Sequence, residues 1–469
     1  MKKQLKSFAL MSLAVVAFAC NKQEPEVPAG GGLLNFTVMV PEDPTEYTAT
    51  NSGPYAPGET IIVEIPSYYE APTDVTALEA YASFDNNCYA KTPVPAIIDF
   101  TTPYEITTVL ANGKTQVNYV EVKLVYPSVK VEQMWRVDAT AMGLTWFNWA
   151  NIAVDADNVY VLDAVQNVGE KILVLDRRTG AKKSEISLPT SCLANVHVDD
   201  AGNLIVTRYN IYGAGFRMYS YDFETSTWSS EIIDYIPIEG VREIPADFGQ
   251  VATIIGDISS TAYVYTSAPG DDKIYSWKFE GGIPQEEPAI TKYTGTTKPW
   301  SFARVRRSSV ADDANLYVGM TYYDATANTS EAVFQQMSST FDLTSIDMAN
   351  FGPRILNFDV FTANESEWLA LAYQDGPERY TGSHFALYNI TDRDMWSMIP
   401  GDNRYAFDFR LYNSEVYGGT NYEQSNGMDV YIDGEVPYVY VSSPAKGSGD
   451  NAIDAANTHV TCYKVNFVK

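Results

Sequence analysis

Alternation of apolar and polar residues marks the first part of the chain after residue 32. This period of two is typical of strands with one buried face, and it occurs in the runs 33–40, 59–66, 77–84 and 119–126. Asn112-Gly113 separates two strand-like segments and favours a tight hairpin turn. Short strands joined by turn signals predict a small β-sandwich over residues 33–130.

The rest of the chain repeats a short apolar motif that follows a polar turn. Its copies begin at Asn158, Asn203, Thr261, Asn315, Glu367 and Pro437, and a second strand-like run follows each copy. A period of roughly 50 residues built of short strands is the pattern of a β-propeller. We therefore expect an all-β protein in which residues 131–469 form a propeller of six blades. The longer last interval indicates either an insertion around 412–433 or a degenerate seventh blade.

The two ends of the repeating region are expected to pair with each other. The final run, 459–467, matches the third strand of the other repeats, so the last blade lacks an outer strand. The segment near 131–137 has the pattern of a strand and can supply it. Such closure would seal the ring and remove two exposed sheet edges.

Two stretches are similar to known domains. Asp99-Phe100-Thr101-Thr102-Pro103, together with the Asn112-Gly113 turn and Tyr119-Val120-Glu121-Val122, resembles the immunoglobulin-like (Ig-like) spacer of surface lipoproteins from gut Bacteroidetes. Asp176-Arg177-Arg178-Thr179-Gly180 resembles a turn of quinoprotein propellers, but it occurs once and without their repeated tryptophan motif, so no cofactor is expected. Over most of its length the chain resembles Bacteroidetes propeller lipoproteins of unknown function, which implies no residue roles.

The N-terminus has the pattern of an export signal. Three lysines precede an apolar run, 8–19, that is too short to span a bilayer. Ala17-Phe18-Ala19-Cys20 resembles the bacterial lipobox, which implies removal of residues 1–19 and a lipid anchor on Cys20. The alternative is a soluble secretory signal with a chance cysteine.

The residues that follow Cys20 are typical of a tether. Residues 20–32 are rich in Pro and Gly and would hold the folded part away from the membrane. The acids after Cys20 resemble the export tails of Bacteroidetes surface lipoproteins. We expect an outer-membrane lipoprotein exposed at the cell surface, with a periplasmic orientation as the alternative.

The charge of the chain limits its partners. A formal net charge of −27 repels phosphate backbones, so nucleic acid is not an expected partner. Anionic lipids and anionic polysaccharides are disfavoured as well, unless a local basic patch exists, whereas neutral glycans carry no such penalty. The three histidines lie far apart, and the Asp155-x-Asp157 turn lacks the glycine and glutamate of a calcium loop, so no metal site is expected. Asp155 is instead expected to cap the backbone of its own β-turn.

Loops of the expected propeller carry aromatic, Arg and Asn side chains together. Such a combination suits sugars, because rings cover the apolar face of a pyranose and fixed polar groups bind its hydroxyls. The candidate ligand-binding residues are Trp146, Asn148, Trp149, Arg208, Tyr209, Trp300, Tyr323, Tyr373 and Arg404. The alternative is that the tryptophans pack between blades.

These features predict a non-catalytic surface lipoprotein that binds a glycan or another nutrient. No catalytic motif is recognised, and with 59 acidic residues a glycosidase pair cannot be chosen from the sequence. The alternatives are a propeller glycosidase or lyase, and a scaffold that docks on a partner outer-membrane protein.

We expect the soluble chain from Gly31 to be retarded in affinity gels that contain one neutral polysaccharide, because aromatic loop residues would bind its sugar rings. Trp149→Ala or Trp300→Ala should reduce the retardation. Unchanged migration across a panel of neutral polysaccharides would contradict glycan binding and favour the docking scaffold.

Overall fold

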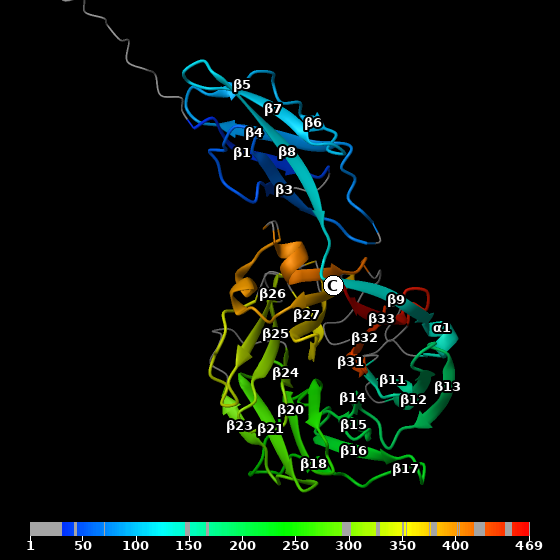
Figure 1. The fold of residues 1–469 in the computed structure, drawn as a ribbon. Helices are drawn as coiled ribbons and strands as arrows, with labels where there is room; N and C mark the ends of the chain where they lie inside the picture. Colours follow the sequence, from blue (N-terminus) through cyan, green and yellow to red (C-terminus); the bar gives the residue numbers. More distant parts are fainter. Residues whose placement is uncertain are drawn as a thin grey trace, which may run out of the picture. The chain divides into compact units, whose positions relative to one another are not determined.

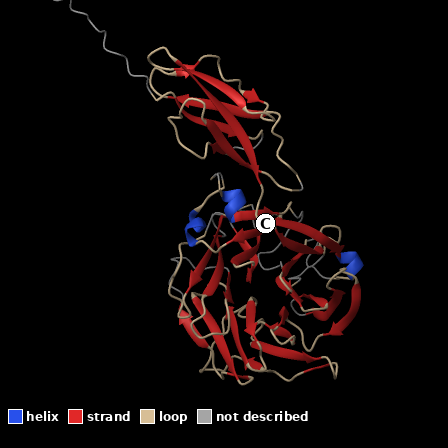
Figure 2. Ribbon diagram, viewed as in Figure 1, coloured by secondary structure: helices blue, strands red, loops and turns tan. Residues whose placement is uncertain are grey.

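The protein is described by a computed structural model. The structure describes residues 31–41, 45–69, 71–145, 151–165, 168–292, 302–324, 329–348, 351–352, 354–374, 376, 382–400, 402, 404–416, 427–445 and 453–468. Two compact units are present: Met1–Ile65 with Asp74–Lys123, and Pro66–Thr73 with Leu124–Lys469. Strands dominate both units, and the few helices are short (Figure 2). The prediction of an all-β protein is confirmed.

The first unit contains two four-stranded antiparallel sheets. One has the order β2(Glu46–Thr48), β1(Leu33–Met39), β4(Leu78–Phe84), β6(Ile97–Ile98); the other has the order β3(Thr60–Pro66), β8(Thr115–Val125), β7(Tyr104–Val109), β5(Tyr89–Ala90). The ring of Phe36 on β1 lies 6.1 Å from that of Tyr104 on β7, so the apolar faces of the two sheets share a core. The Asn112-Gly113 turn joins β7 to β8 as expected, and Gly113 takes the positive φ of 80° that a side chain would oppose.

The second unit contains six antiparallel sheets in chain order. Sheets one to three are β10(Ile152–Val154), β11(Asn158–Val165), β12(Val168–Asp176), β13(Lys182–Ser187); β14(Leu193–Val198), β15(Leu204–Arg208), β16(Phe216–Asp222), β17(Thr227–Trp228), β18(Ile233–Tyr235); and β19(Ala252–Gly256), β20(Thr261–Ser267), β21(Lys273–Glu280), β22(Ile283–Pro284), β23(Ala289–Lys292). Sheets four to six are β24(Phe302–Arg307), β25(Leu316–Asp324), β26(Thr329–Met337); β27(Arg354–Ala363), β28(Ser366–Gln374), β29(Ser383–Asn389), β30(Arg410–Asn413); and β31(Met428–Asp433), β32(Val436–Ser443), β33(His459–Phe467), β9(Val129–Asp138). The short helices are α1(Ala139–Met142), η1(Arg393–Ser397) and η2(Tyr405–Phe409).

The first strands of these sheets lie next to one another in a closed cycle (Figure 1). Strand β10 contacts β14, β14 contacts β19, β19 contacts β24, β24 contacts β27, β27 contacts β31, and β31 contacts β10. Each of the six repeat copies read from the sequence coincides with the second strand of a sheet. The copies are therefore one structural unit used six times within the described residues.

A hydrophobic cluster fills each junction between consecutive sheets, including the junction between the sixth and the first. At the last junction, Tyr440 and Val460 of the sixth sheet pack with Val159 and Leu173 of the first. Full burial of one large apolar side chain contributes about 1.5–3 kcal/mol. These face-to-face contacts are thus the main stabilisation of the second unit.

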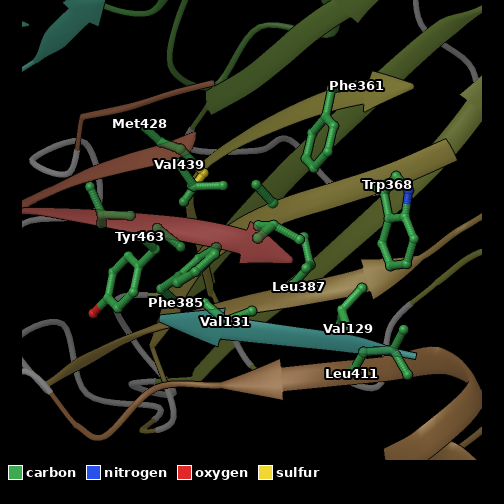
Figure 3. Close-up of a cluster of buried hydrophobic side chains, with 14 of the residues drawn as sticks. Val129, Val131, Phe361, Trp368, Phe385, Leu387, Leu411, Met428, Val439 and Tyr463 are labelled. Atoms are coloured by element: carbon green, nitrogen blue, oxygen red, sulfur yellow. The ribbon is translucent and has the colours of Figure 1, made fainter. Parts of the chain in front are cut away.

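Strand β9 completes the sixth sheet, as the sequence predicted. It pairs antiparallel with β33, with Val131 opposite Val465 and Val137 opposite Val460. Figure 3 shows Val129 and Val131 of β9 beside Leu387 and Phe385 of the fifth sheet. The first and last strands of the unit are therefore held in one sheet and one core.

A buried arginine reinforces the junction between the sixth and first sheets. Arg177 is 2% exposed, and its Nη2 lies 2.9 Å from Asp433 Oδ2. Its guanidinium carbon lies 4.3 Å from the centre of the Tyr431 ring, and its Nε donates to the Ala156 carbonyl. The segment that resembles a quinoprotein turn thus binds the neighbouring sheet.

We expect Tyr463→Ala to destabilise the second unit by about 3–5 kcal/mol, because it removes a large aromatic side chain from a packed core. Tyr463 is 2% exposed, and its ring lies 4.9 Å from that of Phe385 on the fifth sheet. Urea unfolding followed by tryptophan fluorescence reports this unit, since all eight tryptophans lie beyond residue 124. Tyr119→Ala, at a 39% exposed site of the first unit, is the control. An unchanged fluorescence midpoint for Tyr463→Ala would contradict the closure of the sixth sheet described above.

Candidate functional site

A cavity of about 890 Å³ lies among the first strands of the six sheets. Residues from β10, β14, β19, β24, β27 and β31 all line it, so it occupies the middle of the contact cycle. Its polar lining includes Asn151, Asn195, His197, Arg304, Arg306, Asn357, Asp359 and Asp429.

Polar side chains in or beside the first strands, most of them in the cavity wall, tie each sheet to the next sheet or to the segment that precedes it. Asn151 Nδ2 donates to the Ala194 carbonyl, Asn195 Nδ2 to Gly249, Thr253 Oγ1 to Val305, and Arg304 Nε to Leu356, while Asp429 Oδ2 accepts from the Val154 N–H. We call Asn151, Asn195, Thr253, Arg304 and Asp429 the polar girdle. The first strands belong to separate sheets, so they form no backbone hydrogen bonds with one another. Side chains of the girdle therefore bond backbone groups on the strand edges that face the neighbouring sheet.

Arg304 is the most deeply buried cation of the cavity. The residue is 7% exposed, and its Nε donates to the Leu356 carbonyl at 3.1 Å. No carboxylate within the described residues forms an ion pair with it. Burial, together with the positive charge of Arg306, lowers the pKa of Arg304 to about 9. Burial of a charged group without a counter-ion costs free energy, because the group loses its hydration.

Arg306, two residues further along β24, is paired. Its Nε lies 3.1 Å from Asp359 Oδ1, and the two side chains are 14% and 17% exposed. Asp359 Oδ1 also accepts from the Val360 N–H at 2.9 Å. Burial raises the pKa of Asp359, while Arg306 opposes that shift. The ion pair joins the fourth sheet to the fifth.

Asp429 lies in the same electrostatic environment. Burial, and then repulsion by Asp359, raise its pKa to about 7 although Arg306 and the N–H groups of Val154 and Val430 favour its ionised form. Two carboxyls that face one arginine therefore carry less than two negative charges near neutral pH.

His197 on β14 is neutral in this setting. Burial, and then the charges of Arg306 and Arg304, lower its pKa to about 3. Its Nε2 is buried and has no hydrogen-bond partner among the described residues. The ring therefore adds no charge to the cavity at physiological pH.

Aspartates line one end of the cavity, where first strands turn into second strands. Asp155 Oδ1 accepts from the N–H groups of Asp157 and Asn158, and Asp199 Oδ1 accepts from that of Asn203. The predicted turn-capping role of Asp155 is thus confirmed. Among the described residues, no group of His, Cys, Asp and Glu is arranged to hold a metal ion.

None of the sequence-predicted site residues that the structure describes lines this cavity. Cys20, Trp146, Asn148, Trp149 and Trp300 are outside the described residues, as is the side chain of Tyr323, which belongs to β25.

The remaining candidates fall into three environments. Tyr209 and Tyr373 are only 1% and 2% exposed, so their rings face protein neighbours rather than a surface. Tyr373 packs against His384 and donates to Asn413 Oδ1, whereas Tyr209 packs with Cys192 and Ala194. Arg208 is half-buried at the end of β15. Arg404 is exposed and forms an ion pair with Asp408.

The charged residues of the cavity were missed by sequence reasoning, although a signal was present. Residues 302–307, 195–198 and 357–360 place polar side chains at alternate positions in the run before a repeat copy. When polar and apolar residues alternate along a strand of this kind, one of its faces packs in the apolar core and the other faces a polar cavity.

In the described residues, no helix is long and apolar enough to cross a membrane.

We expect Asp429→Asn to remove a pH dependence of stability. The folded protein keeps the Asp429 proton up to about pH 7, whereas the unfolded chain releases it near the ordinary value of 3.8. Between these values the unfolded chain binds fewer protons, so wild-type stability falls as pH rises, by at most about 1.4 kcal/mol per pH unit. Asparagine keeps the neutral form, so the variant should match the wild type at low pH and exceed its unfolding free energy at neutral pH.

Urea unfolding at a series of pH values measures this difference. Asp234→Asn, which changes an exposed carboxylate paired with Arg217 on the outer part of the second sheet, is the matched control. A gap between wild type and Asp429→Asn that stays constant with pH would show that Asp429 is ionised in the folded protein.

Comparison with known proteins gives structural similarities alone. No family model matches the chain, and no curated protein matches it. Among solved structures, a DUF4623 family protein from Bacteroides eggerthii is 13% identical with a TM-score of 0.48, covering 93% of this chain and 99% of that chain. Hydrazine synthase from Kuenenia stuttgartiensis is 11% identical with a TM-score of 0.35, covering 80% of this chain and 91% of that chain. The functional inference therefore rests on the residues of the cavity.

Proposed function

We propose that the protein is a non-catalytic surface lipoprotein that binds a glycan, or another small polar nutrient, in the cavity at the centre of a six-bladed β-propeller. In this proposal an Ig-like sandwich serves as a spacer, and lipid on Cys20 anchors the chain in the outer membrane.

The six-bladed architecture is supported by three independent features of the second unit. Six sheets follow one another in the chain, their first strands contact in a closed cycle, and hydrophobic clusters fill all the junctions of that cycle. Strand β9 completes the last sheet, which is how a ring of sheets is closed.

The observation that carries the binding function is the composition of the cavity wall. Polar side chains from four of the six first strands converge on one space: Asn195 and His197 from β14, Arg304 and Arg306 from β24, Asn357 and Asp359 from β27, and Asp429 from β31. Sugar hydroxyls both donate and accept, so they require such a mixed wall. Cavities that bind small ligands span about 300–1,000 Å³, and this one has about 890 Å³.

A second candidate function is favoured by the two carboxyls. Asp429 holds a proton near neutral pH while Asp359 is paired with Arg306, so one carboxyl could donate a proton and the other remain ionised. Such a difference between neighbouring carboxyls is typical of glycosidases. A propeller glycosidase or lyase is therefore the alternative.

We expect isothermal titration of the full-length protein in detergent with neutral oligosaccharides to give binding for at least one of them. Asn357→Ala should weaken that binding about tenfold, because a side chain that binds a hydroxyl would be lost from the cavity wall. Asn389→Ala, at the end of β29 and away from the cavity, should leave it unchanged.

The same titrations separate the candidate functions. Product release from an oligosaccharide, lost in Asp359→Asn, would establish the enzyme instead. Absence of both heat and product for every oligosaccharide would refute a glycan-binding cavity.

A further inference from the structure

One cation in the cavity has donors that the protein does not use. The Arg304 guanidinium has five N–H donors, and among the described residues it makes one hydrogen bond, from Nε to the Leu356 carbonyl. The residue is 7% exposed and lines the cavity, so its unused Nη groups can be reached only from that space. Buried charges in proteins are normally paired, and within the described residues this one is not.

The other charged groups of the cavity do not compensate Arg304. Arg306, on the same face of β24, is held by Asp359 at 3.1 Å. Asp429 faces Asp359 and Arg306 and accepts from the Val154 N–H, and the proximity of the two carboxyls disfavours a second full negative charge. His197 is uncharged. The central group of Arg304, Arg306, Asp359 and Asp429 therefore carries more positive than negative charge near neutral pH, whereas Asp155, Asp157, Asp199 and Asp200 line one end of the same cavity.

We propose that Arg304 binds the carboxylate of an acidic sugar, so that the ligand of the cavity is a uronic acid residue rather than a neutral one. This inference rests on the proposed function, since it specifies which glycan the same site takes. The paired Nη groups of arginine match the two oxygens of a carboxylate, and bidentate pairs of this kind are among the stronger hydrogen-bonded contacts.

The remaining walls fit one negative charge surrounded by hydroxyls. Asp359 can accept from a hydroxyl, and the amides of Asn195 and Asn357, which also bond protein groups, belong to the same wall. The aspartate-rich end with Asp155 and Asp199 would repel a ligand of high negative charge, such as a sulfated or phosphorylated chain. A single carboxylate supplies the missing counter-ion without that penalty. Within the cavity, Arg304 thus offsets the electrostatic repulsion that this acidic chain as a whole exerts on anionic sugars.

The test is titration of the full-length protein with matched sugar pairs: D-galacturonate against D-galactose, and D-glucuronate against D-glucose, as mono- and disaccharides. One uronate should bind at least about tenfold more tightly than its neutral partner, because hydrogen bonds to charged groups are stronger than neutral ones. Its affinity should fall with added NaCl, while that of the neutral sugar should not.

Arg304→Gln should reduce the uronate affinity to that of the neutral sugar and change the neutral affinity by less than about twofold. The glutamine amide can still donate to the Leu356 carbonyl, which protects the fold. Arg304→Lys keeps the charge and should retain part of the preference. Arg217→Gln removes an arginine from an outer-strand ion pair with Asp234 and should have no effect on either ligand.

The outcomes separate this inference from the function on which it rests. Equal affinity for both members of each pair, or a uronate preference that survives in Arg304→Gln, would overturn the carboxylate site while leaving a glycan-binding cavity. Failure of every sugar to bind would overturn both. If Arg304→Gln does not fold, the Arg304→Lys variant and the salt dependence of the wild type decide the question.

Discussion

The second unit depends on a constraint at its centre: six first strands lie side by side without forming one sheet. Each strand pairs within its own sheet on one edge, so its other edge presents backbone groups that need partners. The polar girdle supplies several of them, from the Asn151 amide on the Ala194 carbonyl to the Asp429 carboxyl on the Val154 N–H. The need to satisfy these groups explains why the core of this unit is polar at the centre and apolar at the sheet junctions.

The same constraint produces the chemistry of the cavity. Arg304 uses one N–H to tie the fourth sheet to the fifth and keeps its remaining donors toward the open space. Arg306 and Asp359 compensate each other across the same junction. A buried ion pair gives little net stability because both groups lose water. Under the proposed function, a ligand accounts for charged residues at these positions, where the stability of the fold does not require them.

Closure makes the girdle possible. Strand β9 joins β33 in the sixth sheet, and Tyr440 and Val460 of that sheet pack against the first. Without this pairing the sixth sheet would have an exposed edge, and Asp429 would not be held against Val154. Arg177, bound to Asp433 and stacked on Tyr431, adds a second link at the same junction. The stability of the last junction and the geometry of the cavity are thus coupled.

The sequence by itself determined the strands, their repetition and the strand that completes the last sheet. These features follow from local rules: a period of two in side-chain direction, turn residues such as Asn112-Gly113, and apolar motifs at a regular interval. The six repeat copies and the segment near 131–137 were located for that reason. The role of Asp155 as a turn cap was equally local, because its partners lie within three residues.

Only the tertiary structure decided which side chains meet. Arg306, Asp359 and Asp429 come from three sheets, and His197 from a fourth, so no spacing along the chain reveals their proximity. The sequence also left the burial of these side chains undecided. It predicted Tyr209 and Tyr373 as exposed loop aromatics, whereas both pack inside the protein. Local pattern fixes the direction of a side chain within its strand, whereas its neighbours depend on how strands from distant segments are brought to a common centre.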